Sequence, residues 1–360
     1  MIAHENLGSD DDDVATESGR MSVPVQIGVV GLGFMGRTHV AAFERAEGCQ
    51  LVAVADRDPI LLTGKPAENG NFDTGGSERL FDPAEISTCE DAMELIEHPD
   101  VELVSVTTPT PTHRALAWAV IGSGRHLLVE KPVDFDPKVL RELAAEARDL
   151  GVLAMPAHCM RFWPAWVWMK ARLDESTYGR CLRASFIRRG AAPGWNQEFY
   201  LDDSRSGGAI VDLHIHDTDF ILHCFGTPDA IRSEGSRRYV STRYEYAEGP
   251  ESVTAEGGWL ADPDAEFTMQ ARFECERGTM TFDIGRDPEI VIELPDGSTE
   301  ARPEASEGGT GYDGQVRALL AAIESGASEP PVTLDHAAET ALVLEAEIAS
   351  VEGGGARIAL

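Results

Sequence analysis

The feature that most restricts how this chain can fold is a glycine-rich turn near its beginning. Residues 23–30 have the apolar pattern of a buried strand, residues 31–36 read Gly-Leu-Gly-Phe-Met-Gly, and a helical pattern covers residues 37–46. In such a turn the first glycine permits a tight bend, the second lets the backbone approach a pyrophosphate, and the third allows the helix to pack closely on the strand. The N-terminus of the following helix attracts phosphate groups. We therefore predict a dinucleotide-binding turn with cofactor contacts from Gly31, Gly33, Phe34, Met35 and Gly36.

An acidic residue after the second predicted strand completes this fingerprint. The strand at residues 51–55 ends in Asp56, 20 residues after Gly36, where an acid is expected to bind the ribose hydroxyls. A carboxylate accepts hydrogen bonds from a ribose 2′-hydroxyl and repels a 2′-phosphate, so Asp56 favours NAD. Arg57 follows directly and has the charge to pair with a phosphate, which keeps NADP open as an alternative.

Strand and helix patterns go on alternating through the first half of the chain. After a long loop at residues 62–80, further strands are expected at 103–107 and 126–129 and helices at 90–97, 115–121 and 137–150. Such alternation predicts an α/β domain with a parallel, doubly wound sheet of the Rossmann type over residues 23–150.

Polar residues follow two of these strands directly. Thr108 and Pro109 come after the strand at 103–107, with His113 shortly beyond, and Glu130 and Lys131 come after the strand at 126–129. Ligands of open parallel sheets bind outside the carboxyl ends of the strands. We therefore expect these five residues to lie beside the cofactor.

The charge balance bears on the chain's partners. The formal net charge is −32, and only four of the 30 basic residues are lysines. An acidic, lysine-poor surface resembles the proteins of halophiles that accumulate salt, whose dense carboxylates hold water and cations while salt screens their repulsion. A halophilic archaeon is the predicted source, and an ordinary acidic protein is the alternative. Such a charge argues against nucleic acid or an anionic membrane as partner. Residues 1–22 form an acidic tail that we expect to be disordered.

The cysteines and the apolar runs bear on location. Six cysteines are scattered without C-x-x-C spacing, which suggests neither a zinc site nor a disulfide framework. No apolar run approaches the roughly 18 residues of a membrane span, and the beginning of the chain lacks the pattern of a signal peptide. We therefore expect a cytoplasmic protein with reduced thiols.

Strand patterns dominate the second half, residues 151–360. They occur at 181–188, 229–238, 251–260, 265–275, 278–284 and 289–294, and short connections such as residues 275–278 indicate antiparallel hairpins. We predict an α+β domain with a large, open and mostly antiparallel sheet. Helices are expected at 312–325 and 334–351, and the last is predicted to pack back on the first domain.

The stretch at residues 207–220 combines glycines with many ionisable residues. If it is helical, Asp212 and His216 are four residues apart and project from the same face. His214 and Asp217 point elsewhere, so structural hydrogen bonding is expected for them and for Asp219. Because ligands two residues apart do not converge on one helix face, no metal site is predicted.

These motifs together resemble the family of glucose–fructose oxidoreductase, inositol dehydrogenase and MocA. The resemblance rests on the glycine turn, on Thr108-Pro109 with His113, and on Glu130-Lys131-Pro132, and it extends from about residue 23 to the C-terminus. It implies that Lys131 lies near the nicotinamide and the substrate, and that the family's Asp-x-x-x-His pattern falls on Asp212 and His216. It also implies that subunits pair through their sheets, as a homodimer or homotetramer.

Three aromatic or basic residues are weaker candidates for the substrate pocket. His158 and Arg161 lie in an aromatic-rich segment that is typical of a core, and the resemblance places that segment close to the substrate. Trp195 offers an apolar face to a sugar ring or serves only in packing.

The expected activity is that of a nicotinamide-dependent dehydrogenase acting on a sugar, polyol or related hydroxyl compound. A histidine with an ordinary pKa of about 6.5 suits the base that takes the hydroxyl proton, and His216 is assigned this role. Lys131 would donate a hydrogen bond to the developing alkoxide, and Asp212 would bind the substrate or stabilise charged His216. The alternatives are a glycosidase that oxidises the sugar transiently and a dinucleotide-binding regulator without turnover.

Overall fold

The computed structural model describes residues 23–65, 79–194, 197–302 and 309–360. The acidic tail at residues 1–22, most of the predicted loop at 62–80, and Trp195 lie outside the described residues. Along the described ranges, no helix combines the length and the apolar character needed to cross a membrane.

The first sheet is parallel and has six strands in the order β3-β2-β1-β4-β5-β6. These strands are β1 (Val25–Val30), β2 (Cys49–Ala55), β3 (Ser87–Cys89), β4 (Leu103–Val106), β5 (His126–Val129) and β6 (Ala154–Pro156). The predicted doubly wound parallel sheet is confirmed. The predicted domain boundary at residue 150 is too early, because β6 pairs with β5 in this sheet. A three-residue strand containing proline leaves too short a pattern to be recognised.

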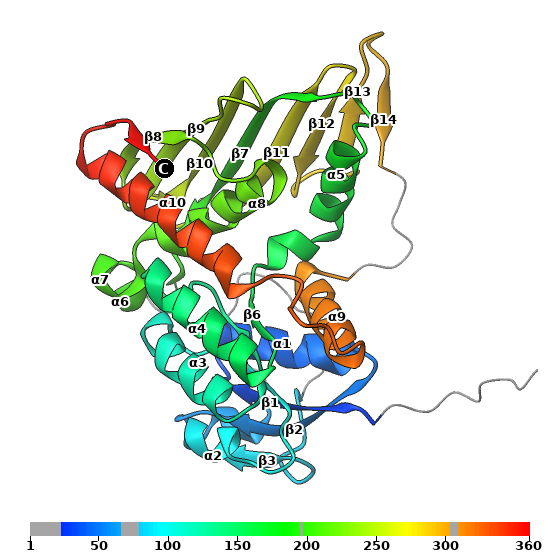
Figure 1. The fold of residues 1–360 in the computed structure, drawn as a ribbon, viewed down its shortest axis with the longest axis vertical. Helices are drawn as coiled ribbons and strands as arrows, with labels where there is room; N and C mark the ends of the chain where they lie inside the picture. The colour runs from blue at the N-terminus through cyan, green and yellow to red at the C-terminus, as the bar shows by residue number, and fades with distance from the viewer. Residues whose placement is uncertain (1–22, 66–78, 195–196, 303–308) are drawn as a thin grey trace, which may run out of the picture.

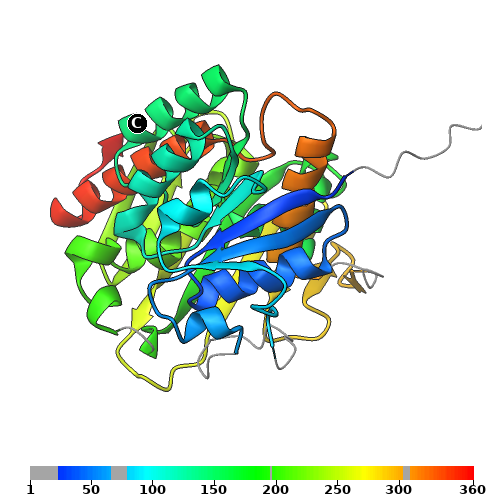
Figure 2. The same cartoon turned by 90° about the horizontal axis from the view of Figure 1, so that it is seen from below.

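Helices cover both faces of this sheet (Figure 2). They are α1 (Phe34–Arg45), α2 (Ala92–Ile96), α3 (His113–Gly122) and α4 (Pro137–Leu150). The bounds of α4 are those predicted, because both ends carry strong signals. Its N-cap Asp136 accepts a hydrogen bond from the backbone N–H of Lys138, and Gly151 ends it in the left-handed conformation.

Among the described residues, the second sheet has nine strands in the order β14-β13-β12-β11-β7-β10-β9-β8-β15, and only β7 and β10 pair in parallel. Its strands are β7 (Cys181–Ala191), β8 (Ala230–Ser236), β9 (Tyr239–Glu245), β10 (Ser252–Leu260), β11 (Thr268–Cys275), β12 (Gly278–Asp283), β13 (Ile290–Glu293), β14 (Thr299–Ala301) and β15 (Ile358–Ala359). The predicted mostly antiparallel sheet is confirmed. The strand predicted at 229–238 ends earlier, and β9 begins after a turn of two arginines, which gave no turn signal.

Three helices lie on one face of the large sheet: α5 (Pro164–Asp174), α8 (Ile215–Phe225) and α10 (Leu334–Glu352) (Figure 1). The core beneath them is aromatic, with Trp166 packed edge-on against Phe220 and Phe282. Along β7 and β11 the side chains alternate between buried and partly exposed positions, so the other face of the sheet is open.

The last two helices join the two sheets. Leu334 and Ala338 of α10 share a core cluster with Leu140 and Leu143 of α4, so this helix packs against the first domain. The helix α9 (Gly311–Glu324) packs in a second cluster with residues of β1 and α1. Burial of these apolar faces holds the two sheets together and fixes the space between them.

Candidate active site

The glycine turn between β1 and α1 has the geometry that its sequence predicts. Gly31 has a φ of +88°, a conformation that residues with a side chain rarely adopt. A Cβ atom on Gly36 would collide with the carbonyl oxygen of Gly31, so the helix can approach the strand only with glycine there. Gly33 is the N-cap of α1 without a capping side chain, and a Cβ atom there would meet nothing within 4 Å. This open space at a helix N-terminus fits the pyrophosphate of a dinucleotide.

Asp56 holds the turn and also faces a large cavity between the two domains. One carboxylate oxygen accepts a hydrogen bond of 2.6 Å from the backbone N–H of Leu32, and the other accepts one of 2.9 Å from Asp58. Arg57 is exposed beside it, and both residues line the same cavity.

The end of β4 is tied to the turn and to the next strand end. The Thr107 hydroxyl donates to the carbonyl oxygen of Gly31 at 2.7 Å. The ring nitrogens of His113 lie 2.6 Å from the carbonyl oxygen of Thr108 and 2.8 Å from that of Pro132. Burial lowers the pKa of His113 despite these contacts. His113 therefore braces the two strand ends at the cavity.

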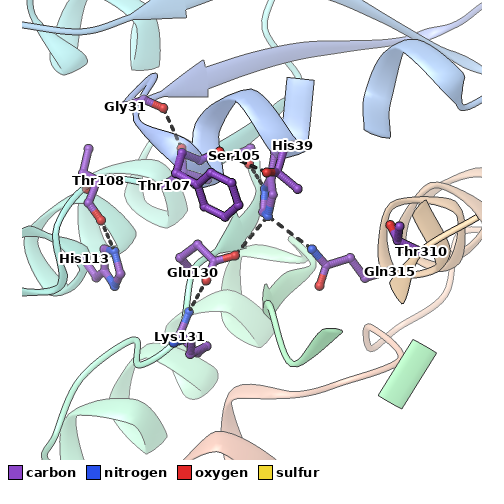
Figure 3. A network of polar contacts seen from close by, with 12 residues as sticks. Gly31, His39, Ser105, Thr107, Thr108, His113, Glu130, Lys131, Thr310 and Gln315 are labelled. Atoms are coloured by element: carbon purple, nitrogen blue, oxygen red, sulfur yellow. Dashed lines mark hydrogen bonds and ion pairs between the residues drawn. The ribbon is translucent and has the colours of Figure 1, made fainter. Parts of the chain in front are cut away.

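Glu130 is the centre of a buried polar network that was not predicted (Figure 3). The Nε2 of His39, from α1, lies 3.0 Å from Glu130 Oε1, and its Nδ1 lies 2.8 Å from the Ser105 hydroxyl. The amide of Gln315, from α9, lies 3.2 Å from the same Nε2. Burial would raise the pKa of Glu130, but His39 and the charge of Lys131 hold it below the ordinary value. The network thus keeps an ionised carboxylate beside Lys131.

Lys131 reaches across from the first domain to the second. Its Nζ donates to the carbonyl oxygen of Asp212 at 2.6 Å and to the Asp212 carboxylate at 3.1 Å. Burial opposes the charge on Lys131, but Asp212 and Glu130 outweigh it and raise the pKa of the lysine. Lys131 is therefore an ammonium group near neutral pH and serves as a hydrogen-bond donor.

His216 lies on the cavity wall next to Asp212, and its pKa is shifted in the opposite direction to that of Lys131. Burial and then the charges of Lys131 and Arg188 lower its pKa well below the ordinary value. Its Nδ1 is buried and has no hydrogen-bond partner. His216 is therefore a neutral imidazole near neutral pH and can accept a proton.

The stretch at residues 207–220 is not the single α-helix that the spacing argument assumed. Gly207 and Gly208 both have a φ of +77° and end the short helix α7 (Asp203–Ser206). The chain then forms a π-helical turn, η5 (Ile210–His214), before α8 begins. Isolated π-helical turns are rare in proteins, but those that occur are often found at functional sites. Asp212 lies in this turn and His216 at the start of α8, and both line the cavity.

The neighbouring ionisable residues have the structural roles expected of them. Asp217 pairs with Arg188 at 2.8 Å, and Asp219 pairs with Arg161 at 2.8 Å. His214 lies 3.4 Å from Glu347, a partner from α10. All three pairs are buried. The first two anchor α8 to β7 and to the segment before α5, and the third ties the π-helical turn before α8 to α10.

His158 and Arg161 do not line the cavity. Two nitrogens of Arg161 donate to the Asp219 carboxylate, and His158 is buried 3.5 Å from the same carboxylate. Arg161 thus neutralises Asp219, whereas burial lowers the pKa of His158.

A cavity of about 1070 Å³ between the two domains brings most of the predicted residues together. Its lining includes Gly31, Gly33, Phe34, Met35, Asp56, Arg57, Thr108, Pro109, His113, Glu130, Lys131, Asp212 and His216. Gly36 lies behind the turn. Among the described residues, no group of His, Cys, Asp and Glu is arranged to hold a metal ion.

Several lining residues escaped the sequence analysis, among them Trp163, Arg188, Tyr200, Trp259 and Tyr312. The aromatic ones have no local pattern that separates a pocket wall from a core. Arg188 did leave a signal, because it alternates in phase with the buried residues of β7. A charge at such a position indicates a buried pair or a site.

Comparison with known proteins agrees with this architecture. Residues 25–158 match a family model described as "Oxidoreductase family, NAD-binding Rossmann fold", and residues 166–286 match one for the GFO/IDH/MocA C-terminal domain. Inositol 2-dehydrogenase of Rhizobium meliloti (strain 1021) is 26% identical over 347 residues, which are 91% of this chain and 97% of the relative. Trans-1,2-dihydrobenzene-1,2-diol dehydrogenase of Sus scrofa is 33% identical over 150 residues, only 43% of its length.

Among solved structures, a levoglucosan dehydrogenase in complex with NADH and levoglucosan superimposes with a TM-score of 0.77. The match covers 93% of this chain and 99% of that one at 18% identity. At this identity the likeness shows the fold alone.

Proposed function

The chain belongs to the GFO/IDH/MocA oxidoreductase family, and from this premise we propose that it oxidises a secondary hydroxyl group of a sugar, polyol or related cyclic compound. It is an NAD-dependent oxidoreductase that acts on CH–OH groups. The similar proteins named for inositol and for 1,5-anhydro-D-fructose support this substrate class.

One observation carries the assignment of roles. Lys131, a permanent donor, contacts Asp212, and both line one cavity with His216, a neutral acceptor. Oxidation of an alcohol needs this combination, because the hydroxyl proton must leave as the carbonyl forms.

Each residue has one step in the proposed reaction. Lys131 donates to the substrate oxygen and stabilises the negative charge that develops on it. His216 takes the hydroxyl proton, and Asp212 holds the Lys131 ammonium in place and offsets the charge that His216 acquires. When bound, NAD supplies the hydride acceptor. The glycine turn and Asp56 would hold its pyrophosphate and adenosine ribose.

Two substitutions test these roles. Lys131→Met removes the charge at similar length, and we expect kcat to fall by about 10²–10³. For His216→Gln we expect a loss of about 10²–10⁴. The dissociation constant for NAD, measured by calorimetry, should change little in either. Lys138→Met, at an exposed lysine on α4, is the control and should keep full activity. Near-full turnover by Lys131→Met or His216→Gln would contradict the role assigned to it.

A substrate screen separates this proposal from the other two activities considered. Polyols, aldoses and glycosides are offered with NAD while NADH absorbance is followed. Release of free sugar without net NADH would point to a glycosidase. Tight NAD binding with no turnover of any substrate would point to a regulator.

We also propose that the open face of the large sheet pairs with a second copy of the chain, in the cytoplasm of a halophile. Four arginine–glutamate pairs cross that face, Arg183–Glu274, Arg189–Glu256, Arg232–Glu245 and Arg272–Glu293. Each of these pairs is neutral, in a chain of net charge −32. Light scattering in concentrated potassium chloride should give a dimer or tetramer, and a monomer at micromolar concentration would contradict the proposal. Unfolding on removal of the salt is expected.

A further inference from the structure

Among the residues that the structure describes, the main hydrogen-bonding groups on the substrate side of the cavity are gathered at one place. Lys131, Asp212 and His216 lie together there, and Tyr200 is close enough to influence the pKa of Lys131. We call these four residues the polar corner. They suffice for the reacting hydroxyl and one neighbour.

The remaining cationic side chain on this wall, Arg188, already uses three of its five N–H groups in contacts with other side chains. Nε and Nη2 of Arg188 donate to the Asp217 carboxylate, and Nη1 donates to the Met269 sulfur at 2.8 Å. The guanidinium also lies 5.4 Å from the centre of the Trp166 ring. Arg188 therefore acts as a buried structural charge under the wall.

Beyond the polar corner the second-domain wall is aromatic or thioether in character. It includes Met160, Trp163, Trp259, Phe267 and Met269, from segments that are far apart in the sequence. Tyr200 stands edge-on to Trp259 at 5.9 Å. Such side chains offer an extended apolar surface and few partners for hydroxyl groups.

A further tyrosine adds mainly its ring to this wall. Tyr312 stands edge-on to Trp163 at 6.4 Å, and burial raises the pKa of its hydroxyl group well above the ordinary value. Its ring extends the apolar wall towards Glu130.

A hydroxyl group that leaves water and finds no partner lowers affinity, whereas apolar surface buried against this wall raises it. A ring bearing hydroxyl groups on every carbon would meet partners on one edge only. A ring with its hydroxyl groups on one edge and hydrocarbon elsewhere matches the whole wall.

We infer that the preferred substrate is a cyclic secondary alcohol or vicinal diol whose hydroxyl groups share one edge of an otherwise apolar ring. This inference rests on the proposed function, since it names the substrate of the same site. The apolar wall, formed mainly by Trp163, Trp259 and Phe267, selects the ring, and the polar corner selects the hydroxyl edge.

The test compares trans-1,2-cyclohexanediol with myo-inositol, which share a six-membered ring and differ in four hydroxyl groups. With NAD in concentrated potassium chloride, we expect kcat/KM for the diol to exceed that for inositol by at least about 10-fold. Binding without turnover is measured by calorimetry on the NADH complex, where the dissociation constants should differ in the same direction.

A substitution on the wall ties the preference to its residues. Phe267→Asn places a polar group there and should reduce the preference for the diol by about 10-fold. Phe135→Asn makes the same change at an exposed position outside this cavity and should leave the preference intact. Unchanged NAD affinity in both variants reports intact folding.

The outcomes separate the two proposals. If inositol binds and reacts at least as well as the diol, the inference is overturned while the proposed function stands. If neither compound nor any other alcohol is oxidised although NAD binds, the proposed function is wrong. Tighter binding of inositol to the NADH complex would overturn the inference even in that case.

Discussion

The two walls of the cavity are built on different principles. The cofactor wall is a contiguous backbone turn whose shape follows from the positions of Gly31, Gly33 and Gly36. The substrate wall is an assembly of side chains from helices and strands that meet only in the folded chain. Steric rules within a few residues determine the shape of the glycine turn, which Asp56 and Thr107 then hold by hydrogen bonds. Pairs between distant residues determine the substrate wall.

The buried ion pairs show what the substrate wall depends on. Arg188 and Asp217 are 29 residues apart, and Arg161 and Asp219 are 58 apart. All four side chains are less than a tenth exposed. A buried pair contributes little net stability over apolar residues, but it is costly to break, because the remaining charge has no water. We therefore expect the substrate wall to be most sensitive to substitutions that remove one partner of a buried ion pair. The cofactor wall should be most sensitive to substitutions that add atoms to its glycines.

The largest effect is expected from Asp217→Ala, which leaves Arg188 buried without its carboxylate. Loss of one partner of a buried pair costs about 3–5 kcal/mol of unfolding free energy. Urea denaturation at constant potassium chloride measures this change. Removing both charges with Arg188→Met and Asp217→Ala should restore part of the loss. Glu175→Ala, at an exposed ion pair, is the control and should cost less than about 1 kcal/mol. If Asp217→Ala and Glu175→Ala lowered the unfolding free energy equally, the substrate wall would not depend on its buried ion pairs.

A pair of glycine substitutions tests the cofactor wall by sterics alone. Gly36→Ala forces a Cβ atom against the carbonyl oxygen of Gly31, and we expect a loss of about 3 kcal/mol, at the upper end for overpacking. Gly33→Ala meets no neighbour and should keep near-normal stability. It should nevertheless weaken NAD binding, because the methyl group occupies the open space at the helix N-terminus. If both variants bind NAD like the unaltered protein, the turn is not the pyrophosphate site.

The difference between the walls also explains what could be read from the sequence. The glycine turn, Asp56 and the strand ends at Thr108 and Lys131 are local patterns, and the structure places them all on one cavity. The pairing of Arg161 with Asp219 could not be read, because it depends on how α8 packs. The π turn at Asp212 was likewise missed, since helical spacing assumes a regular helix. Contacts between distant segments produce no periodic pattern of residues, so they cannot be predicted from a single sequence in this way.

We propose that the charge of Asp56 gives the cofactor wall its preference for NAD, and the substitution Asp56→Asn removes that charge alone. The amide oxygen can still accept the hydrogen bond from the Leu32 backbone that steadies the turn. We expect the preference for NAD over NADP to fall by about 10-fold, or about 1.4 kcal/mol. The ratio of dissociation constants for the reduced cofactors measures it. Asp58→Asn, at an exposed neighbour, is the matched control, and an equal effect there would assign the selectivity to general surface charge.

The smallest expected effect is the loss of folding stability at low pH that comes from protonation of His216. Burial lowers the pKa of His216 in the folded state, whereas the unfolded chain keeps a value of about 6.5. As the pH falls, the unfolded chain therefore binds a proton at His216 before the folded protein does. The contribution of neutral His216 to folding stability is complete above about pH 6.5 and is lost as the pH falls towards the folded pKa. Its slope is at most about 1.4 kcal/mol per pH unit.

His216→Gln should remove this component, because glutamine does not titrate. Unfolding free energies of both proteins, measured from pH 7 downwards, should converge or cross as the pH falls, while the other buried histidines contribute to both curves. The glycine turn has no comparable group, so NAD affinity should change less across this range than binding to the substrate wall. Parallel stability curves for the two proteins would mean that the pKa of His216 is the same in the folded and unfolded states, which would contradict the lowering by burial.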